Sequence, residues 1–441
     1  MKIFLTVLIL LTATLFFTGC QQADLPAENT VPEDIMEQEI IIEIIDEFPE
    51  EWAKLIVVYE KDGLLMLAKG GNTPQILIDE LEFSSPLLSP DGKHLLYAIT
   101  YYDEREGYDG EYAGSYYDLW LTDLDVGTTK PFVTEEMLRP AKDLPIGKYL
   151  PWLSPIRVTW LNSGNKIAFV SHMTAHVWGF NNNDLWLADL VTGEVIELLP
   201  DEMGGSFAFS PDGALLLVAN STSVSLMDSS GDQRLEVLKF SSISVDYEKS
   251  YVPQPVWAPD SSYGLVALIG PDSFSLSAKA NSFEEPGNVE IWKIYRDGST
   301  EKLLDINWPQ YHELMTGNIF SPDSRSIVSS LESDLVSGAR LINLEGEIIT
   351  TFDYFSTIIN WSPDGRMLLV KKDDQLVMLR TDGREVSYPY ASANKWTSPT
   401  KFVVLQETQL EGYELWLVDL NGRKIMIDTG VSGEFDALLI D

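Results

Sequence analysis

Cysteine, histidine and basic residues are scarce in this sequence. Among 441 residues there are one cysteine and four histidines, and 30 Lys and Arg stand against 68 Asp and Glu. A single cysteine cannot form a disulfide within the chain, or a zinc site that needs two or four cysteines. The formal net charge of −38 argues against nucleic acid as a partner, because a phosphate backbone needs a basic footprint.

Several signatures of catalysis are also missing. The sequence contains no P-loop, no His-Glu-x-x-His and no Gly-x-Ser-x-Gly motif. His172 and His176 are four apart, but we interpret their segment as a loop and expect no metal site there. We expect no cofactor, with calcium as the alternative. The carboxylates that could hold calcium, without the order of an EF-hand, are Asp103, Asp109, Glu111 and Asp118.

Long apolar runs are rare, and the longest stands at the N-terminus. Lys2 precedes a run from Ile3 to Phe17, which is typical of a secretory signal and too short to span a bilayer as a helix. The stretch Phe17-Thr18-Gly19-Cys20 resembles the lipobox of bacterial lipoproteins. This resemblance implies that residues 1–19 are removed and that Cys20 is lipidated. An ordinary signal peptide with a chance cysteine is the alternative.

A lipidated Cys20 would place the protein outside the cytoplasm, anchored on the cell surface or on the periplasmic side of a membrane. Residues 20–50 then form an acidic tether, since Gln21 to Glu51 contain eleven acids and no base. Like-charge repulsion extends such a segment. The apolar cluster at residues 40–45 is an exception, and we expect it to pack on the following domain as a strand or a short helix.

A repeated turn motif organises the chain after residue 51. Ser-Pro-Asp-Gly begins at Ser89, Ser210 and Ser362. Related copies begin at Leu161, Ala258, Ser321 and Thr397. Proline, aspartate and glycine suit successive positions of a tight turn, and the β-branched and aromatic runs between the turns predict antiparallel strands. Four short strands in each unit predict an all-β fold, a β-propeller rather than a sandwich.

The Ser-Pro-Asp-Gly units resemble the WD40-like (PD40) repeats of TolB-like propellers, which also occur in prolyl oligopeptidases. The resemblance covers residues 85–430 and implies the fold. It implies no activity or partner, because the sequence has no room for the extra α/β domain of TolB and encodes no hydrolase domain. The recurrent Trp120, Trp186, Trp292 and Trp416 lie in matching strands, where we expect them to pack between blades.

We expect eight blades within residues 51–441. Residues 54–79 supply three strands without an inner one, and the run from Phe435 to Ile440 is a spare strand. Pairing the two would close the ring and remove both sheet edges. Seven blades are the alternative, if the weak unit around Ser398 is not a separate blade.

The longest insertions fall on one face of the predicted propeller. We expect these segments, among them 101–117, 134–155 and 171–184, to be loops that form a binding surface. The candidate binding residues are Tyr101, Tyr102, Tyr108, Tyr112, Tyr116, Tyr117, Trp152, His172, His176, Trp178, Trp308 and Tyr311. Acidic, tyrosine-rich loops favour cationic segments or sugar rings. The alternative is that these aromatics pack the loops on each other.

These observations predict a lipid-anchored, non-catalytic propeller. It would bind a protein, a peptide or an envelope polymer, with a cationic partner favoured, through its loop-rich face. An alternative is a glycan-active hydrolase or lyase that uses carboxylates at the central channel. A third hypothesis, by analogy with TolB, is a subunit or chaperone of an envelope machine.

Overall fold

The structure is a computed structural model, and its described residues all fall within the unit Glu37–Asp441. They are residues 43–44, 47–79, 83–107, 110–144, 150–175, 178–181, 183–246, 249–269, 287–308, 319–330, 338–353, 357–372, 375–388, 391–408 and 412–440. The predictions for the signal segment, for Cys20 and for most of the tether fall outside them. So do Tyr108, His176 and Tyr311 among the candidate binding residues.

The described chain is all-β apart from three short helical turns, which are η1 (Glu50–Trp52), α1 (Glu135–Leu138) and η2 (Arg139–Lys142). Consecutive strands pair antiparallel in small sheets. The first sheet is β5 (Phe83–Leu88), β6 (His94–Gly107), β7 (Gly110–Asp123) and β8 (Thr129–Val133). The next is β9 (Trp152–Trp160), β10 (Lys166–Ala175), β12 (Leu185–Asp189) and β13 (Val195–Leu199), with β11 (Trp178–Asn181) on β10.

The remaining sheets follow the same pattern. They are β14 (Ser206–Phe209), β15 (Leu215–Ala219), β16 (Ser223–Asp228) and β17 (Leu235–Lys239); β20 (Val256–Trp257), β21 (Tyr263–Ile269), β22 (Gly287–Tyr295) and β23 (Thr300–Trp308); β24 (Ser326–Ser330), β25 (Gly338–Asn343) and β26 (Ile348–Asp353); and β27 (Thr357–Trp361), β28 (Met367–Lys372), β29 (Gln375–Arg380) and β30 (Glu385–Tyr388). Phe320 bridges to Ile327 at the free edge of β24. A two-stranded ribbon joins β18 (Ser244–Asp246) and β19 (Lys249–Ser250).

The two ends of the described chain meet in one larger sheet. It is formed by β31 (Ala391–Ser398), β32 (Lys401–Glu407), β33 (Tyr413–Asp419), β34 (Arg423–Leu439), β2 (Leu55–Lys61), β3 (Leu64–Lys69) and β4 (Gln75–Ile78). Val431 in β34 lies opposite both Tyr413 in β33 and Lys61 in β2. The first half of β34 therefore pairs with β33, and its second half is the missing partner of the N-terminal strands.

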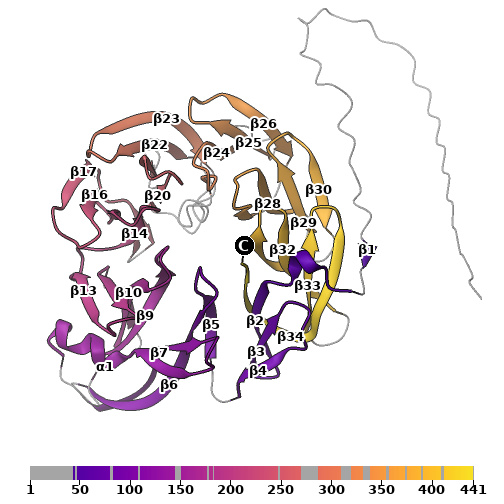
Figure 1. Cartoon of the computed structure of the whole chain (residues 1–441). Coiled ribbons are helices and arrows are strands. Elements are labelled where there is room, and N and C mark those ends of the chain that lie inside the picture. Colours follow the sequence, from indigo (N-terminus) through magenta and orange to yellow (C-terminus); the bar gives the residue numbers. More distant parts are fainter. Residues whose placement is uncertain are drawn as a thin grey trace, which may run out of the picture. The chain divides into compact units, whose positions relative to one another are not determined.

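The sheets are arranged around a common centre, and the C-terminus lies beside it (Figure 1). The space between neighbouring sheets is filled by apolar clusters, and burying each large apolar side chain contributes about 1.5–3 kcal/mol. Trp186 and Trp416 are buried in such clusters, while Trp120 and Trp292 are half-buried against them. The prediction that the recurrent tryptophans pack between sheets is confirmed.

The Ser-Pro-Asp-Gly motif forms the predicted tight turn. Ser89 donates its hydroxyl to Asp91 at 2.6 Å and accepts the backbone N–H of His94 at 2.9 Å. Gly92 takes a left-handed φ of +67°. The serine-to-aspartate hydrogen bond recurs in the turns that begin at Ser210, Ser321 and Ser362. Because these bonds satisfy the turn from within, the motif is structural in every one of these copies.

Two segments predicted as loops are hairpins. Strands β6 and β7 remain paired from His94 opposite Asp123 as far as Gly107 opposite Gly110, and β10 turns back on itself through β11. The expectation of irregular loops at 101–117 and 171–184 is therefore wrong for their described residues. Threonine and tyrosine favour extended backbone, which explains why the pairing continues beyond the sheet.

The described part of the 40–45 cluster is a strand. Glu43 and Ile44 form β1, which pairs parallel with Arg423 and Lys424 of β34. Ile44 is 61% exposed, so this strand attaches to the edge of the sheet without entering the core. In the part of the chain that the structure describes, no helix has the length and apolarity to cross a bilayer.

Candidate functional site

The most prominent extension of the fold is the far part of the β6–β7 hairpin, residues 100–107 and 110–117, here called the β6–β7 ribbon. Strand β5 pairs with β6 only as far as Ile99, and β8 pairs with β7 only from Leu119. The ribbon thus continues beyond the four-stranded part of its sheet while keeping its own cross-strand pairing. It contains five of the twelve candidate binding residues in described positions: Tyr101, Tyr102, Tyr112, Tyr116 and Tyr117.

Alternation along the two strands gives the ribbon two different faces. One face, here called the open face, consists of Tyr102, Glu104, Glu106, Glu111, Ala113 and Ser115, all of them exposed. The other, here called the anchored face, consists of Tyr101, Asp103, Arg105, Tyr112, Gly114 and Tyr116, all buried or half-buried. The segment that precedes and begins β9 supplies the contacts that bury the anchored face.

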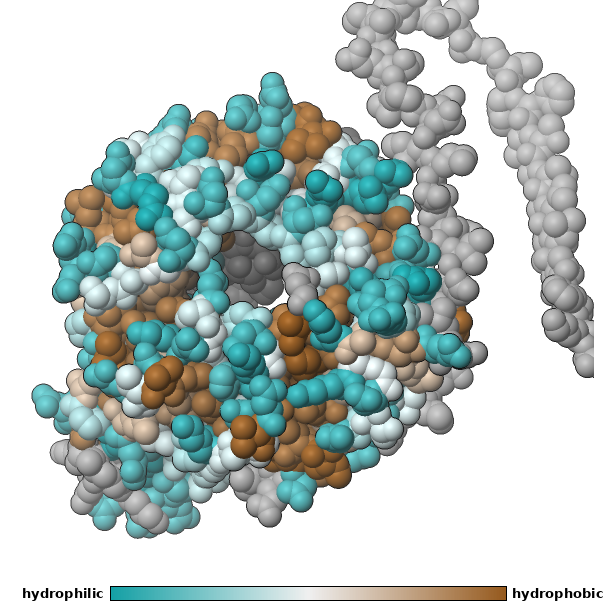
Figure 2. All heavy atoms as spheres, viewed as in Figure 1, coloured by the Kyte–Doolittle hydropathy of each residue, from teal (hydrophilic) through white to brown (hydrophobic). Residues whose placement is uncertain are grey.

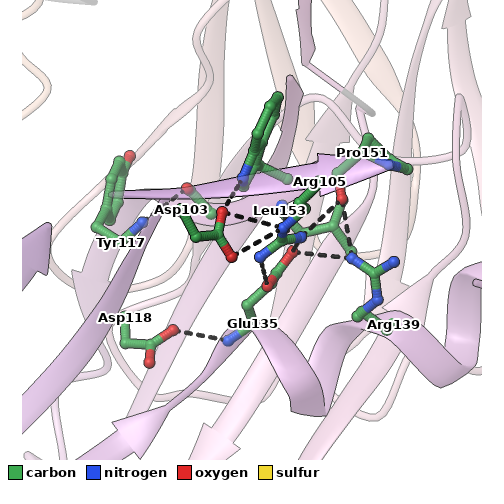
Figure 3. A network of polar contacts seen from close by, with 10 residues as sticks. Asp103, Arg105, Tyr117, Asp118, Glu135, Arg139, Pro151 and Leu153 are labelled. Carbon is green, nitrogen blue, oxygen red and sulfur yellow. Dashed lines mark hydrogen bonds and ion pairs between the residues drawn. The ribbon is translucent and has the colours of Figure 1, made fainter. Parts of the chain in front are cut away.

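Arg105 is the centre of the anchored face, and its side chain is 3% exposed. Its two terminal nitrogens donate to the two oxygens of Glu135 in α1 at 2.5 and 2.6 Å (Figure 3). Arg139 donates to the same carboxylate at 3.0 Å, and the backbone N–H of Leu153 does so at 3.0 Å. The carbonyl of Pro151 accepts from both arginines, at 3.1 and 2.8 Å. Every charge in this buried network has an opposite partner.

Aromatic contacts complete the attachment. Asp103 accepts the indole N–H of Trp152 and the Nε of Arg105. The guanidinium of Arg105 lies 4.9 Å from the ring centre of Tyr116 and 5.5 Å from that of Trp152, within the range of cation–π attraction. Gly114 is required here, because a Cβ atom at this position would lie 2.6 Å from the Trp152 ring.

The anchored face also perturbs its ionisable groups. Burial raises the pKa of Asp118, at the base of the ribbon, to about 6, and repulsion from Glu135 adds to this. The backbone N–H of Glu135 donates to Asp118 at 2.7 Å and opposes the shift (Figure 3). Burial likewise raises the pKa of Tyr116 to about 12, and it raises that of Tyr117, on the other side of β7, to about 12. For Arg105, burial disfavours the charge, but Glu135 outweighs it and raises the pKa.

Part of the aromatic set predicted for binding is used inside the molecule instead. Trp152 is 1% exposed, so the prediction that it lines a binding surface is wrong in this structure. Tyr101 and Tyr116 stack at 5.4 Å, and the hydroxyl of Tyr101 accepts the indole N–H of Trp120. For these residues the alternative, packing within the molecule, is the one observed. Tyr102, by contrast, is 70% exposed.

The second hairpin adjoins the support of the ribbon. In the pairing of β9 with β10, Trp152 lies opposite Thr174, and Ser154 lies opposite His172. Ser154 also accepts the backbone N–H of Tyr117 at 3.0 Å. Trp178 begins β11 in the same hairpin, whereas Trp308 ends β23 in another sheet. His172 is half-buried.

The described residues contain one group of three carboxylates close enough to share a metal ion: Asp184, Glu197 and Asp201. The ammonium of Lys142 lies between them, 2.9 Å from Asp184, 2.6 Å from Glu197 and in contact with Asp201. Burial disfavours its charge, yet the carboxylates raise the pKa of Lys142. The ammonium of the lysine thus occupies the place that a metal ion would take between the carboxylates. It also links η2 to the next sheet.

The carboxylates considered for calcium do not converge. Asp103 lies on the anchored face of the ribbon and Glu111 on the open face, so their side chains point in opposite directions. Asp118 is bonded to the backbone of Glu135. Asp109 falls outside the described residues.

A pocket of about 330 Å³ lies where β5, β31 and β34 meet, a site that the sequence did not indicate. Its lining residues are Ser85, Pro86, Leu87, Lys395, Gly433, Glu434, Phe435 and Asp436. Lys395 lies 3.0 Å from Asp436. Asp436 also accepts the backbone N–H of Leu88 at 2.7 Å, and Glu434 accepts that of Ser85 at 2.5 Å. Both acids therefore join β34 to β5.

No family model matches the sequence, and no curated protein matches it. Among solved structures, the chain is similar to dipeptidyl peptidase 4 of Porphyromonas gingivalis, with a TM-score of 0.51 and 11% identity over 88% of this chain. The likeness spans 57% of that enzyme's chain. At such identity it shows the fold alone.

Two weaker likenesses are to TolB from Acinetobacter baumannii and to oligogalacturonate lyase from Vibrio parahaemolyticus. TolB has a TM-score of 0.32 and 12% identity, over 78% of this chain and 82% of its own. The lyase has a TM-score of 0.42 and 12% identity, over 87% of this chain and 96% of its own. The four-stranded antiparallel sheets, arranged around a common centre, agree with a β-propeller.

Proposed function

We propose that the protein is a lipid-anchored, extracytoplasmic β-propeller that acts as a non-catalytic binding module for a protein, a peptide or an envelope polymer. The resemblance of Phe17-Thr18-Gly19-Cys20 to a lipobox supports the anchor, with Cys20 as the lipidated residue. A chain held by an acyl group stays on the membrane surface without spanning it.

The propeller has eight blades in this proposal. Seven units begin at β5, β9, β14, β20, the Phe320–Ile327 bridge, β27 and β31, and the eighth combines the second half of β34 with β2, β3 and β4. Sharing β34 between the last and first blades would close the ring and leave no long open edge.

The observation that carries the binding function is the contrast between the two faces of the β6–β7 ribbon. The anchored face is held by the Arg105–Glu135 pair and by Trp152, whereas the six residues of the open face are all exposed. A surface that is already fixed loses little conformational entropy when a partner binds. Hydrophilic and apolar residues are interspersed around the ring on the face seen in Figure 2.

A glycan-active hydrolase or lyase is the second candidate, favoured by the pocket between β5, β31 and β34. Glu434 and Asp436 are the carboxylates that it would use. Both already accept backbone N–H groups of neighbouring residues, which supports a structural role for them. Turnover of an envelope glycan by the wild type, lost in Glu434→Gln with folding intact, would favour the enzyme.

Affinity capture from membranes tests the binding function. The anchored wild type is compared with a variant that lacks residues 103–115, the part of the ribbon beyond Tyr102 and Tyr116. We expect partners that the wild type retains and the shortened variant loses. Recovery of the same partners by both would contradict the proposal, provided that both melt cooperatively.

The anchor has its own test. Labelling with a radioactive fatty acid should modify the wild type and not Cys20→Ala. Equal labelling of the two proteins would refute lipidation at this residue.

A further inference from the structure

We propose that the open face of the β6–β7 ribbon binds an extended segment of a protein or peptide that carries lysine or arginine at alternate positions. The inference rests on the proposed binding function and adds the surface and the chemistry of the partner. Tyr102 and the three glutamates Glu104, Glu106 and Glu111 are the residues that would make the contacts.

The charge of the open face has one sign. The ribbon's single base, Arg105, lies on the opposite face, where Glu135 binds it with both oxygens. The open face therefore keeps three carboxylates and no cation among its six residues. A partner that supplies cations would be complementary to it.

The cross-strand register adds a second reason. Glu106 lies directly opposite Glu111, so two exposed carboxylates of like charge face each other across the ribbon. Such pairs are destabilising in an isolated sheet. A lysine or arginine side chain between them would replace the repulsion by two attractive contacts.

Spacing selects an extended partner. Glu104 and Glu106 are two residues apart on one strand, which places their Cα atoms about 7 Å apart. That separation equals the repeat of side chains on one side of an extended peptide. Basic residues at alternate positions of the partner would thus meet successive acids.

Tyr102 gives the same face an aromatic contact. Its side chain is 70% exposed, and it lies two residues before Glu104 on the same side of β6. A guanidinium or ammonium group is attracted to the face of such a ring. The order tyrosine, glutamate, glutamate along β6 therefore offers three successive positions to a cationic partner.

Titration of a fluorescein-labelled peptide tests this inference. The probe, here called the alternating peptide, is an octapeptide in which lysine and serine alternate. It is added to the full chain in detergent micelles and followed by fluorescence anisotropy at two salt concentrations. The test variant is Glu104→Gln/Glu106→Gln/Glu111→Gln. The matched control, Asp125→Asn/Glu194→Gln/Glu345→Gln, removes the same charge from exposed turns outside the ribbon.

We expect the test variant to bind the alternating peptide about tenfold more weakly than the wild type, and the control variant less than twofold, since each exposed ion pair contributes little alone. A block peptide of the same composition, with all its lysines before all its serines, should bind more weakly than the alternating peptide. Equal weakening in both variants would overturn the inference, because the general negative field would then explain binding. Unchanged affinity in the test variant would also overturn it.

Failure of this inference can be distinguished from failure of the proposed function. If membrane partners are lost on deletion of residues 103–115 but retained by the triple glutamine variant, the ribbon binds them without its acids. The proposed binding function would then be supported, and the proposal of a cationic partner would be wrong. None of the three glutamates contributes to the anchored face, so we expect their substitution to leave the fold intact. Melting curves of each variant check that a loss of binding is not caused by unfolding.

Discussion

The guanidinium of Arg105 and the carboxylate of Glu135 are joined by two hydrogen bonds of 2.5 and 2.6 Å, between residues 30 positions apart in the chain. This pair connects a hairpin that extends from one sheet to the segment that leads into the next. Without this pair, the ribbon would be attached only at the end that joins its own sheet. With it, the ribbon is a rigid platform.

Breaking the buried pair should destabilise the protein strongly. In Arg105→Met the carboxylate of Glu135 keeps Arg139 and loses its main partner, and we expect a loss of about 3 kcal/mol in the free energy of unfolding. Urea denaturation measures it. The matched control is Lys239→Met, which removes an exposed pair with Glu236 and should cost less than about 0.5 kcal/mol. Equal stability of both variants would show that the pair does not hold the ribbon.

Asp118 should make stability depend on pH in an unusual direction. Burial raises the pKa of its carboxyl to about 6, above the ordinary value of 3.8, so the folded state binds the proton more tightly than the unfolded state. This group therefore stabilises the fold as the pH falls from 7 to 4 and costs stability at pH 7. We expect Asp118→Asn to be about 1–3 kcal/mol more stable than the wild type at pH 7.

The pH series of urea curves supplies the control for Asp118. The advantage of the asparagine variant should shrink as the pH falls and disappear near pH 4, because asparagine mimics the protonated acid. A constant difference across the series would show that the carboxyl titrates normally.

Lys142 should be replaceable by a metal ion. Lys142→Met leaves the carboxylates of Asp184, Glu197 and Asp201 together without a cation, and we expect a loss of about 3 kcal/mol. Oxygen ligands at this separation suit calcium, so millimolar calcium should raise the melting temperature of the variant and not that of the wild type. Lys166→Met, which removes a single half-exposed pair with Asp189, is the control and should not respond. No calcium response in Lys142→Met would contradict the interpretation of the lysine as an internal cation.

The second half of β34 should be essential for cooperative folding. Ending the chain after Val431 removes the strand that pairs with β2 and uncovers Leu55, Val57 and Tyr59, all buried in the present structure. We expect a broad or absent thermal transition by circular dichroism. Removal of Asp441 alone is the control and should leave the transition unchanged. A sharp transition in the longer truncation would show that the N-terminal strands do not need this partner.

Much of the scaffold could be predicted from the sequence, because the residues that determine it lie close together in the chain. Ser89, Asp91 and Gly92 satisfy one another within a single turn, so a short motif is enough to identify it. The pairing of the C-terminal run with the N-terminal strands was also accessible, since both segments lacked a partner within their own repeat. The pattern of the ribbon predicts a loop and not a hairpin, because its strands mix acids with tyrosines and show no apolar alternation. The dipeptide Asp109-Gly110 was the signal that could have revealed a hairpin.

The site itself could not be predicted from sequence, because its contacts are long-range. Nothing local shows that Glu135, rather than a neighbouring acid, binds Arg105, or that Trp152 is covered by Gly114. The pocket is even harder to predict, because its lining residues Ser85 and Glu434 are 349 positions apart in the chain. The strand register decides which tyrosines are exposed. Tyr102 lies on the open face and is exposed, whereas Tyr101 lies on the anchored face and is half-buried.

Photo-crosslinking at single positions shows whether a partner binds to the open face of the ribbon. A photoreactive phenylalanine analogue replaces Tyr102 in one protein and Val191, an 80% exposed residue in a turn between β12 and β13, in the other. Both anchored proteins are irradiated in membranes with and without an excess of the alternating peptide. We predict an adduct from position 102 that the peptide suppresses, and none from position 191. Equal adducts from both positions, or an adduct from position 102 that the peptide leaves unchanged, would contradict a binding surface for cationic segments on the open face.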